Sequence, residues 1–222
     1  MSDAARISAE TVERLKQAGT GVVVDALALL GFQGGVEGIH PARGFEEVRL
    51  AGPASTIQFG LPRPDTPKLT TYGIIEYLPS GSILVIDAKG DPRHFAGDNM
   101  GTFAKQRGLL GAVVAGGARD IAGWRRAGMP LYCMGLATKD KPADLRITGC
   151  QVPVEIGGVL VKPDDILVTD EDGIVAVPRE SLEALLEKVT LVQDVEAAMQ
   201  EAIARKASGA ELAGIIARKK PK

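Results

Sequence analysis

The sequence is poor in the residues on which several common kinds of site depend. Its 222 residues include two cysteines, Cys133 and Cys150, and two histidines, His40 and His94. Two distant cysteines are not a disulfide framework, so both are expected to be small buried side chains in a reducing compartment. Two histidines give little material for a zinc site or a Ser-His-Asp triad, so a metal here would use hard oxygen ligands.

The chain also lacks a strong charge of either sign and a long apolar run. The formal net charge is -2, so no basic excess is available to bind a nucleic-acid backbone. The longest apolar stretch, residues 108–118, is too short for a membrane span and contains four glycines. Residues 1–10 contain no hydrophobic signal segment. These absences predict a cytoplasmic protein that binds neither nucleic acid nor membrane.

The order of elements in the centre of the chain predicts an α/β fold. Three apolar, partly β-branched runs predict buried strands, and two helices are predicted between them. The strands are residues 82–86, 112–115 and 131–134, and the helices are residues 98–107 and a short segment ending at Ala127. Asp98 is the expected N-cap of the first helix. Strands that alternate with helices pair in parallel, so the loops that follow the strands meet at one edge of the sheet.

The flanking segments have other patterns. Helices are predicted at residues 9–17 and 21–30, with stops at Gly19 and Gly31, and a strand at residues 55–59. Short strands separated by glycine- and aspartate-containing turns predict antiparallel hairpins, and they are residues 152–154, 159–161, 166–169 and 174–177. Residues 179–207 have balanced charges and predict one or two helices.

Two loops at the predicted sheet edge contain residues suited to chemistry. The helix that starts at Asp98 has free main-chain N–H groups at Asn99 and Met100, with the positive end of the helix dipole behind them, which suits an anion. Arg119 adds a planar guanidinium for a carboxylate, and Asp98 and Asp120 with water molecules could hold magnesium. Each feature also has an ordinary explanation: Asp98 as a helix cap, and Arg119 with Asp120 as a charge pair at a helix start.

The segment Gly97-Asp98-Asn99-Met100, followed after twenty intervening residues by Arg119-Asp120, resembles the signature of a known family. That family contains 4-hydroxy-4-methyl-2-oxoglutarate aldolase and the RraA-type regulators of ribonuclease activity. The similarity extends over roughly residues 20–180. It includes Asp25-Ala26-Leu27, residues 52–56, residues 107–120, Gly128-Met129-Pro130, residues 163–165 and residues 170–173.

The resemblance implies a fold and an assembly. The α/β fold would be the swivelling β/β/α sandwich (RraA-like), formed by residues 1–178. Residues 179–222 would form a C-terminal helical extension that packs on a neighbouring subunit. The chain would assemble as a homotrimer or homohexamer with its sites between subunits.

The resemblance also implies roles for individual residues. Substrate would be bound by the main-chain amides of Gly97, Asp98, Asn99 and Met100, and its pyruvoyl carboxylate and carbonyl by Arg119. Asp120 would hold the divalent metal partly through water, and Asp98 would orient a metal-bound water or the water that exchanges the proton. Glu196 from a neighbouring subunit would complete the site, with Glu201 as the alternative.

The function implied by the resemblance is that of a class II pyruvate aldolase. With Mg²⁺ or Mn²⁺, it would cleave 4-hydroxy-2-oxo acids such as 4-hydroxy-4-methyl-2-oxoglutarate to pyruvate. The same enolate would allow oxaloacetate to be decarboxylated. A Schiff-base route is disfavoured, because Lys105, the nearest lysine, lies opposite the apolar stripe of its predicted helix.

The main alternative is an RraA-type regulator that binds and inhibits a ribonuclease. The resemblance implies that such members need no metal and lack the acidic residue after the arginine. Asp120 and the C-terminal helices therefore favour the enzyme. A menaquinone methyltransferase, a name that some members carry, is disfavoured because the sequence has no GxGxxG loop.

Overall fold

Strand β3 (Leu50–Gly60) joins the two parts of the main sheet in this computed structural model, which describes residues 7–219. Its first half pairs antiparallel with β11 (Ile166–Thr169), and its second half pairs parallel with β4 (Ile83–Asp87). The strand is longer than the predicted residues 55–59, because pairing with β11 continues it past Pro53 to Leu50.

The other strands are mostly short. They are β1 (Gly35–Val36), β2 (His40–Pro41), β5 (His94–Ala96), β6 (Gly111–Ala118), β7 (Leu131–Leu136), β8 (Arg146–Cys150), β9 (Val154–Ile156), β10 (Val159–Val161) and β12 (Ile174–Val177). The strand order in the main sheet is β1-β12-β11-β3-β4-β6-β7-β2, with β5 added to β6 and β8 added to β3. Strands β9 and β10 form a separate antiparallel hairpin, and β11 pairs antiparallel with β12, as predicted.

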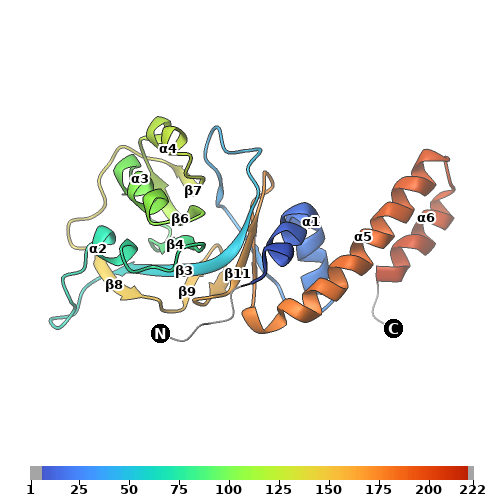
Figure 1. Cartoon of the computed structure of the whole chain (residues 1–222), viewed down its shortest axis with the longest axis horizontal. Coiled ribbons are helices and arrows are strands. Elements are labelled where there is room, and N and C mark those ends of the chain that lie inside the picture. The colour runs from blue at the N-terminus through green and yellow to red at the C-terminus, as the bar shows by residue number, and fades with distance from the viewer. Residues whose placement is uncertain (1–6, 220–222) are drawn as a thin grey trace.

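Strands β4, β6 and β7 pair in parallel, which confirms the predicted order. All residues of β4 and β6 are buried, and alternate side chains enter different cores. Ile83 and Val85 pack beneath the β9–β10 hairpin, whereas Leu84 and Ile86 face the helices. These helices are α2 (Thr71–Ile75), α3 (Asp98–Gln106) and α4 (Ile121–Ala127) (Figure 1). The result is two layers of strands and one layer of helices.

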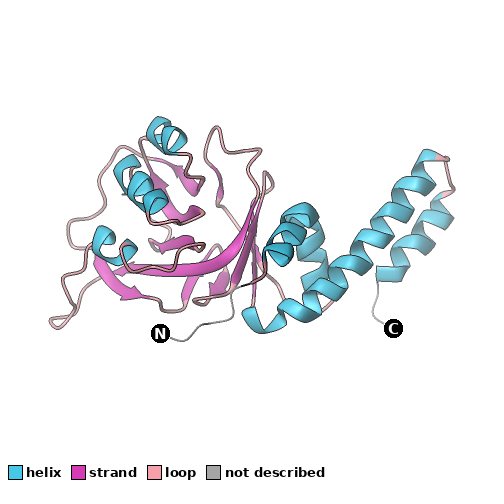
Figure 2. Cartoon of the chain, in the orientation of Figure 1, coloured by secondary structure: helices cyan, strands magenta, loops and turns pink. Residues whose placement is uncertain are grey.

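Helices at the two ends of the described chain cover the antiparallel part of the sheet. Helix α1 (Ala9–Ala28) and the first half of α5 (Leu182–Ala204) pack on the outer face of β11 and β12. The rest of α5 packs against α6 (Gly209–Ile216), and the two extend away from the sheet (Figures 1 and 2). Short 3₁₀ turns lie at η1 (Arg179–Ser181) and η2 (Ala217–Lys219). The predicted helical extension is present, and its packing on a neighbouring subunit stays a prediction.

Among residues 7–219, no helix has the length and apolar character needed to cross a bilayer. Residues 1–6, most of the segment expected to lack a signal sequence, lie outside the described part.

Helix α1 consists of two helical pieces, as the glycine at position 19 predicted. Gly19 has φ 74° and ψ 171°, a conformation open to glycine. The second piece begins at Thr20, whose N–H and hydroxyl donate to the two carboxylate oxygens of Asp170, each at 2.7 Å. Because Thr20 and Asp170 are both buried, this cap ties α1 to the turn between β11 and β12.

Replacement of Asp170 by alanine should destabilise the fold. The change leaves two buried donors of Thr20 without a partner, so we expect the free energy of unfolding to fall by about 2–3 kcal/mol in urea denaturation. The exposed neighbour Asp172 is the matched control. Asp172→Ala should change the free energy of unfolding by less than about 0.5 kcal/mol. Equal effects of the two variants would contradict the assigned cap.

Candidate functional site

Main-chain hydrogen bonds hold the end of β6 beside the start of α3. Strand β5, in a segment expected to be a loop, pairs parallel with the end of β6 and matches Ala96 with Ala118. The N–H of Arg119 then donates to the carbonyl of Ala96 at 2.9 Å. Because Gly97 follows Ala96 and is the N-cap of α3, Arg119 lies beside the first turn of that helix.

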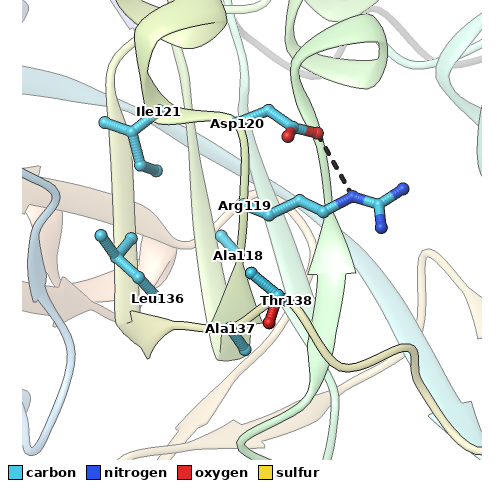
Figure 3. Close-up of a pocket in the computed structure, with 7 residues that line it drawn as sticks. All are labelled: Ala118, Arg119, Asp120, Ile121, Leu136, Ala137 and Thr138. Carbon is cyan, nitrogen blue, oxygen red and sulfur yellow. Dashed lines mark ion pairs between the residues drawn. The ribbon is translucent and has the colours of Figure 1, made fainter.

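A pocket of about 650 Å³ opens where β6 and β7 end. Arg119 and Asp120 are its charged side chains, and Ile121 and Leu136 supply apolar surface (Figure 3). The full lining is Ala118, Arg119, Asp120, Ile121, Leu136, Ala137 and Thr138. This is the carboxyl edge of the parallel strands, where open α/β sheets bind ligands.

The two charged side chains of the pocket contact each other. The Nε of Arg119 lies 3.2 Å from Oδ2 of Asp120, and the side chains are 43% and 47% exposed. A pair with this exposure contributes at most about 1 kcal/mol, so a ligand can compete with it. The contact uses Nε, and the two terminal nitrogens of Arg119 project beyond it (Figure 3).

Asp120 has an unusual backbone conformation, with φ 62° and ψ 38°. It is the N-cap of α4, and its carbonyl accepts a hydrogen bond from the N–H of Gly123 at 2.8 Å. Its side chain makes no capping hydrogen bond. A non-glycine residue in the left-handed region costs about 1–3 kcal/mol, and such strain concentrates at functional sites. Here the carboxylate is turned toward α3 instead of capping its own helix.

Gly97 is the point at which α3 meets this pair. A Cβ atom at Gly97 would lie 3.1 Å from Oδ2 of Asp120 and 3.7 Å from Nε of Arg119. The first hydrogen bond inside α3 joins the Gly101 N–H to the Gly97 carbonyl at 3.2 Å. The earlier N–H groups, from Asp98 to Met100, therefore have no partner within the helix. The structure thus brings Arg119, Asp120 and the amino end of α3 together.

The other predicted residues of α3 lie differently. The prediction of Asp98 as the N-cap was wrong: Gly97 occupies that position, and Asp98 is the first helical residue. The Asp98 side chain lies against Gly123 of α4, with Oδ2 3.8 Å from Nη2 of Arg126, so it does not line the pocket. Asn99 is exposed, whereas the Met100 side chain is buried in the core and leaves only its main chain for a ligand.

The protein supplies only one of the oxygen ligands that a hard cation at this site would need. Asp120 offers one carboxylate. Because Gly97 has no Cβ, the space beside Oδ2 of Asp120 is not filled by a side chain of Gly97. Within residues 7–219, no group of three His, Cys, Asp or Glu side chains could hold a metal together. Mg²⁺ keeps much of its water shell and accepts one or two protein carboxylates, so Asp120 with water and a ligand's oxygens is a suitable set.

The structure does not bring Glu196 to this pocket within one chain. Glu196 is on α5, where Oε1 lies 3.3 Å from Nζ of Lys219. Glu201, the alternative, is exposed on the same helix. In Figure 1, α3 and α4 lie at the left, whereas α5 runs from the centre of the molecule toward α6 at the right. A contribution from a neighbouring copy stays a prediction.

Sequence reasoning missed Asp140, in the loop after β7. Its Oδ1 lies 3.6 Å from Nη1 of Arg119 and 3.2 Å from Nε2 of His94. The predicted parallel order could have indicated this residue. Because β7 was predicted to run parallel to β6, the loop after β7, which contains Asp140, belongs to the same sheet edge. The cysteines, by contrast, are structural: burial raises the pKa of both the Cys133 and the Cys150 thiol, so neither is a ready nucleophile.

Comparisons with known proteins identify relatives of this chain. A family model described as RraA-like, Aldolase/RraA, matches residues 20–176. A Halalkalibacterium halodurans protein provisionally named 4-hydroxy-4-methyl-2-oxoglutarate aldolase is 34% identical over 161 residues, which are 71% of this chain and 73% of that protein. The Legionella pneumophila protein DlpA is 29% identical over 87% of this chain, and the match spans only 31% of DlpA.

A solved structure confirms the predicted fold. Streptomyces coelicolor RraAS2, described as an unusual member of the RNase ES inhibitor RraA protein family, matches with a TM-score of 0.78 and 29% identity. The match covers 90% of this chain and all of the other. That coverage is larger than residues 1–178, so part of the C-terminal helical segment also has a counterpart in that structure. The family model and the H. halodurans relative together show that this chain belongs to the RraA-like (Aldolase/RraA) family.

Proposed function

We propose that this chain is a divalent-metal-dependent pyruvate aldolase that cleaves 4-hydroxy-2-oxo acids such as 4-hydroxy-4-methyl-2-oxoglutarate. The observation that supports this most is the close approach of Gly97, at the amino end of α3, to Arg119 and Asp120, which line the pocket. The name of the H. halodurans relative supports the substrate class. Decarboxylation of oxaloacetate is the expected side activity.

Substrate binding uses groups of both signs. The guanidinium of Arg119 pairs with the carboxylate of the 2-oxo acid, and the N–H groups of Asn99 and Met100 face its negative oxygens. Asp120 would hold Mg²⁺ or Mn²⁺, and the bound cation supplies Lewis-acid stabilisation of charge on the 2-oxo group. Ile121 and Leu136 give the pocket an apolar surface beside these charged groups.

Cleavage breaks the C3–C4 bond after the C4 hydroxyl has lost its proton. As that bond breaks, the C4 oxygen forms the carbonyl group of the second product. The electron pair of the bond becomes the enolate of pyruvate, and the enolate then takes up a proton at C3. Arg119 and the helix N–H groups stabilise the developing negative charge, and one well-placed donor is worth about 3–4 kcal/mol. Asp98 can handle the proton only through a water molecule, since its carboxylate lies against α4.

The assembly belongs to the same proposal. We expect a homotrimer or homohexamer in which Glu196 from a neighbouring copy approaches the pocket, since one chain supplies a single carboxylate there. Glu201 is the alternative ligand on the same helix.

The alternative function, regulation of a ribonuclease, is favoured by the description of the Streptomyces structure. An assay of pyruvate release distinguishes the two functions. The chain should release pyruvate from 4-hydroxy-4-methyl-2-oxoglutarate with Mg²⁺, lose this activity with a chelator and regain it when Mg²⁺ is restored. Absence of turnover, together with inhibition of a ribonuclease, would support the regulator instead.

Asp120→Asn should abolish metal-dependent activity. Asparagine tolerates the left-handed backbone, so the variant removes the charge without breaking the turn. We expect kcat/KM for pyruvate release to fall more than about a hundredfold, since Lewis-acid stabilisation is worth several kcal/mol. The exposed Asp144, on the loop after β7, is the matched control, and Asp144→Asn should keep wild-type rates. Activity of Asp120→Asn that resists chelator would refute the metal role.

Arg119→Ala should lower kcat/KM for any pyruvoyl substrate by more than about tenfold, because the ligand carboxylate loses its partner. Arg119→Lys keeps the charge but loses the planar fork, so its rate should fall between those of alanine and wild type. Arg43→Ala, at an exposed position away from the pocket lining, is the control. Steady-state kinetics at fixed Mg²⁺ would measure all three, and wild-type values for Arg119→Ala would contradict the proposal.

Gly97→Ala should reduce activity without unfolding the protein. The backbone at Gly97, with φ -131°, accepts alanine, but the new Cβ would lie 3.1 Å from Oδ2 of Asp120. We expect kcat/KM to fall about tenfold or more, because displaced catalytic groups are costly. Gly21→Ala meets no atom within 4 Å and should leave the activity unchanged. Thermal unfolding of both variants would separate loss of activity from loss of fold.

A further inference from the structure

A second pocket lies next to the pocket of Arg119, between the loops that follow β4 and β7. Its volume is about 430 Å³, and its charged lining residues are Lys89, Asp91, Arg93 and Lys139. Thr138 lines the first pocket, and Lys139, the next residue of the same loop, lines the second. Because β4, β6 and β7 run in parallel, both pockets open at the carboxyl edge of the sheet.

Main-chain contacts fix the place of Lys139 close to Arg119. The carbonyl of Lys139 accepts a hydrogen bond from the main-chain N–H of His94 at 3.0 Å. The residue after Lys139, Asp140, has its Oδ1 3.6 Å from Nη1 of Arg119. The side chain of Lys139 therefore begins one position before a residue that contacts the guanidinium of Arg119.

The other cations of the second pocket are already paired with carboxylates. Arg93 donates to Asp91 through Nε at 2.8 Å and through Nη2 at 2.5 Å. Lys89 has its Nζ 2.5 Å from Oδ2 of Asp87, whose side chain is fully buried. Within the part of the chain that the structure describes, the Lys139 side chain makes neither an ion pair nor a hydrogen bond. Lys139 is therefore the cation of this pocket that is available to a ligand.

The carboxylates nearest to Lys139 face other partners. Hydrogen bonds from Arg93 hold the pKa of Asp91 below its usual range, and the charge of Lys139 makes a smaller contribution of the same sign. Asp140 has its Oδ1 3.2 Å from Nε2 of His94 in addition to its contact with Arg119. The ammonium group of Lys139, on a flexible stem, can therefore turn toward an anion in the first pocket.

The proposed substrate needs a second cation. In 4-hydroxy-4-methyl-2-oxoglutarate one carboxylate is C1 and the other is C5, which is attached to the carbon whose bond to C3 breaks. Among the described residues, the lining of the first pocket has one cationic side chain, Arg119, which the proposed function assigns to C1. A C5 carboxylate that lost its water without gaining a partner would weaken binding. Lys139, from the adjoining pocket, is placed to supply that partner.

We propose that Lys139 determines specificity by pairing with the C5 carboxylate of a dicarboxylic 4-hydroxy-2-oxo acid. The proposal rests on the proposed aldolase function and on Arg119 as the partner of C1. When the C3–C4 bond breaks, C4 keeps its methyl group and the C5 carboxylate, and its oxygen becomes a carbonyl, so the second product is also pyruvate. Because C5 is charged before and after cleavage, Lys139 should lower KM for the dicarboxylate with little effect on kcat.

The first test is calorimetric titration of the full chain at fixed Mg²⁺ with two 2-oxo acids that have no C4 hydroxyl and so cannot undergo this cleavage. One, 2-oxoglutarate, has the C5 carboxylate, and the other, 2-oxopentanoate, has a methyl group in its place. Wild-type protein should bind 2-oxoglutarate about fivefold more tightly. Lys139→Met should remove this preference by weakening only the binding of 2-oxoglutarate, and Lys139→Arg should retain it with the charge. Lys141→Met, at an exposed position outside both linings, is the control and should keep the wild-type preference.

The kinetics of pyruvate release separate a role in specificity from a general loss of function. Lys139→Met should raise KM for 4-hydroxy-4-methyl-2-oxoglutarate about fivefold and retain kcat. Both constants should stay unchanged for 4-hydroxy-4-methyl-2-oxopentanoate, in which a methyl group replaces the C5 carboxylate. An equal loss for both substrates, or a preference for the dicarboxylate that survives in Lys139→Met, would overturn the inference. Failure of wild-type protein to bind either 2-oxo acid would overturn the proposed function itself, whereas equal binding of the two would overturn only the role of Lys139.

Discussion

The hydrogen bond from the Arg119 N–H to the Ala96 carbonyl is the contact on which the geometry of the pocket depends. It forms because β5 adds to the edge of β6 just before the chain turns into α3. The end of one element and the start of another are thereby fixed by main-chain atoms. Gly97 lets the two approach, since a side chain at that position would enter the space between α3 and Asp120. The side chains of Arg119 and Asp120 then add charge at a place whose geometry is determined by main-chain contacts.

The packed cores beneath the pocket hold α3 and α4 in place on the sheet. Alternate residues of β4 and β6 enter two different cores, and α3 and α4 are anchored in one of them by Met100, Ala104 and Trp124. A shift of either helix would expose apolar surface and open packed space, which is costly. The antiparallel part of the sheet has its own core with α1 and α5. Helices α5 and α6 thus pack outside the core that holds α3 and α4.

The charged contacts around the pocket are of a different kind. The side chains of Arg119, Asp120 and Asp140 are between 43% and 85% exposed, and pairs with such exposure contribute little to stability. They can therefore rearrange when a ligand binds, while the main-chain contacts remain. His94 differs from them, because its ring is largely buried and held on both sides. The rearrangement is thus confined to side chains at one edge of the sheet.

Local patterns in the chain were enough to predict the parallel order of β4, β6 and β7, the break at Gly19 and the position of Arg119 and Asp120 at a strand end. These features follow from runs of apolar residues and from glycine, whose effects act within a few positions. The short strand β5, the cap at Gly97 and the contacts of Asp140 were not predictable in this way. Strand β5, His94-Phe95-Ala96, has no β-branched residue of the kind that marked the other short strands. Either Gly97 or Asp98 could begin the helix, and Asp140 meets His94 and Arg119 only after distant segments have packed. The spacing of apolar residues along the sequence predicts which residues are buried. The direction of a polar side chain depends instead on residues that are distant in sequence and become its neighbours only in the folded structure.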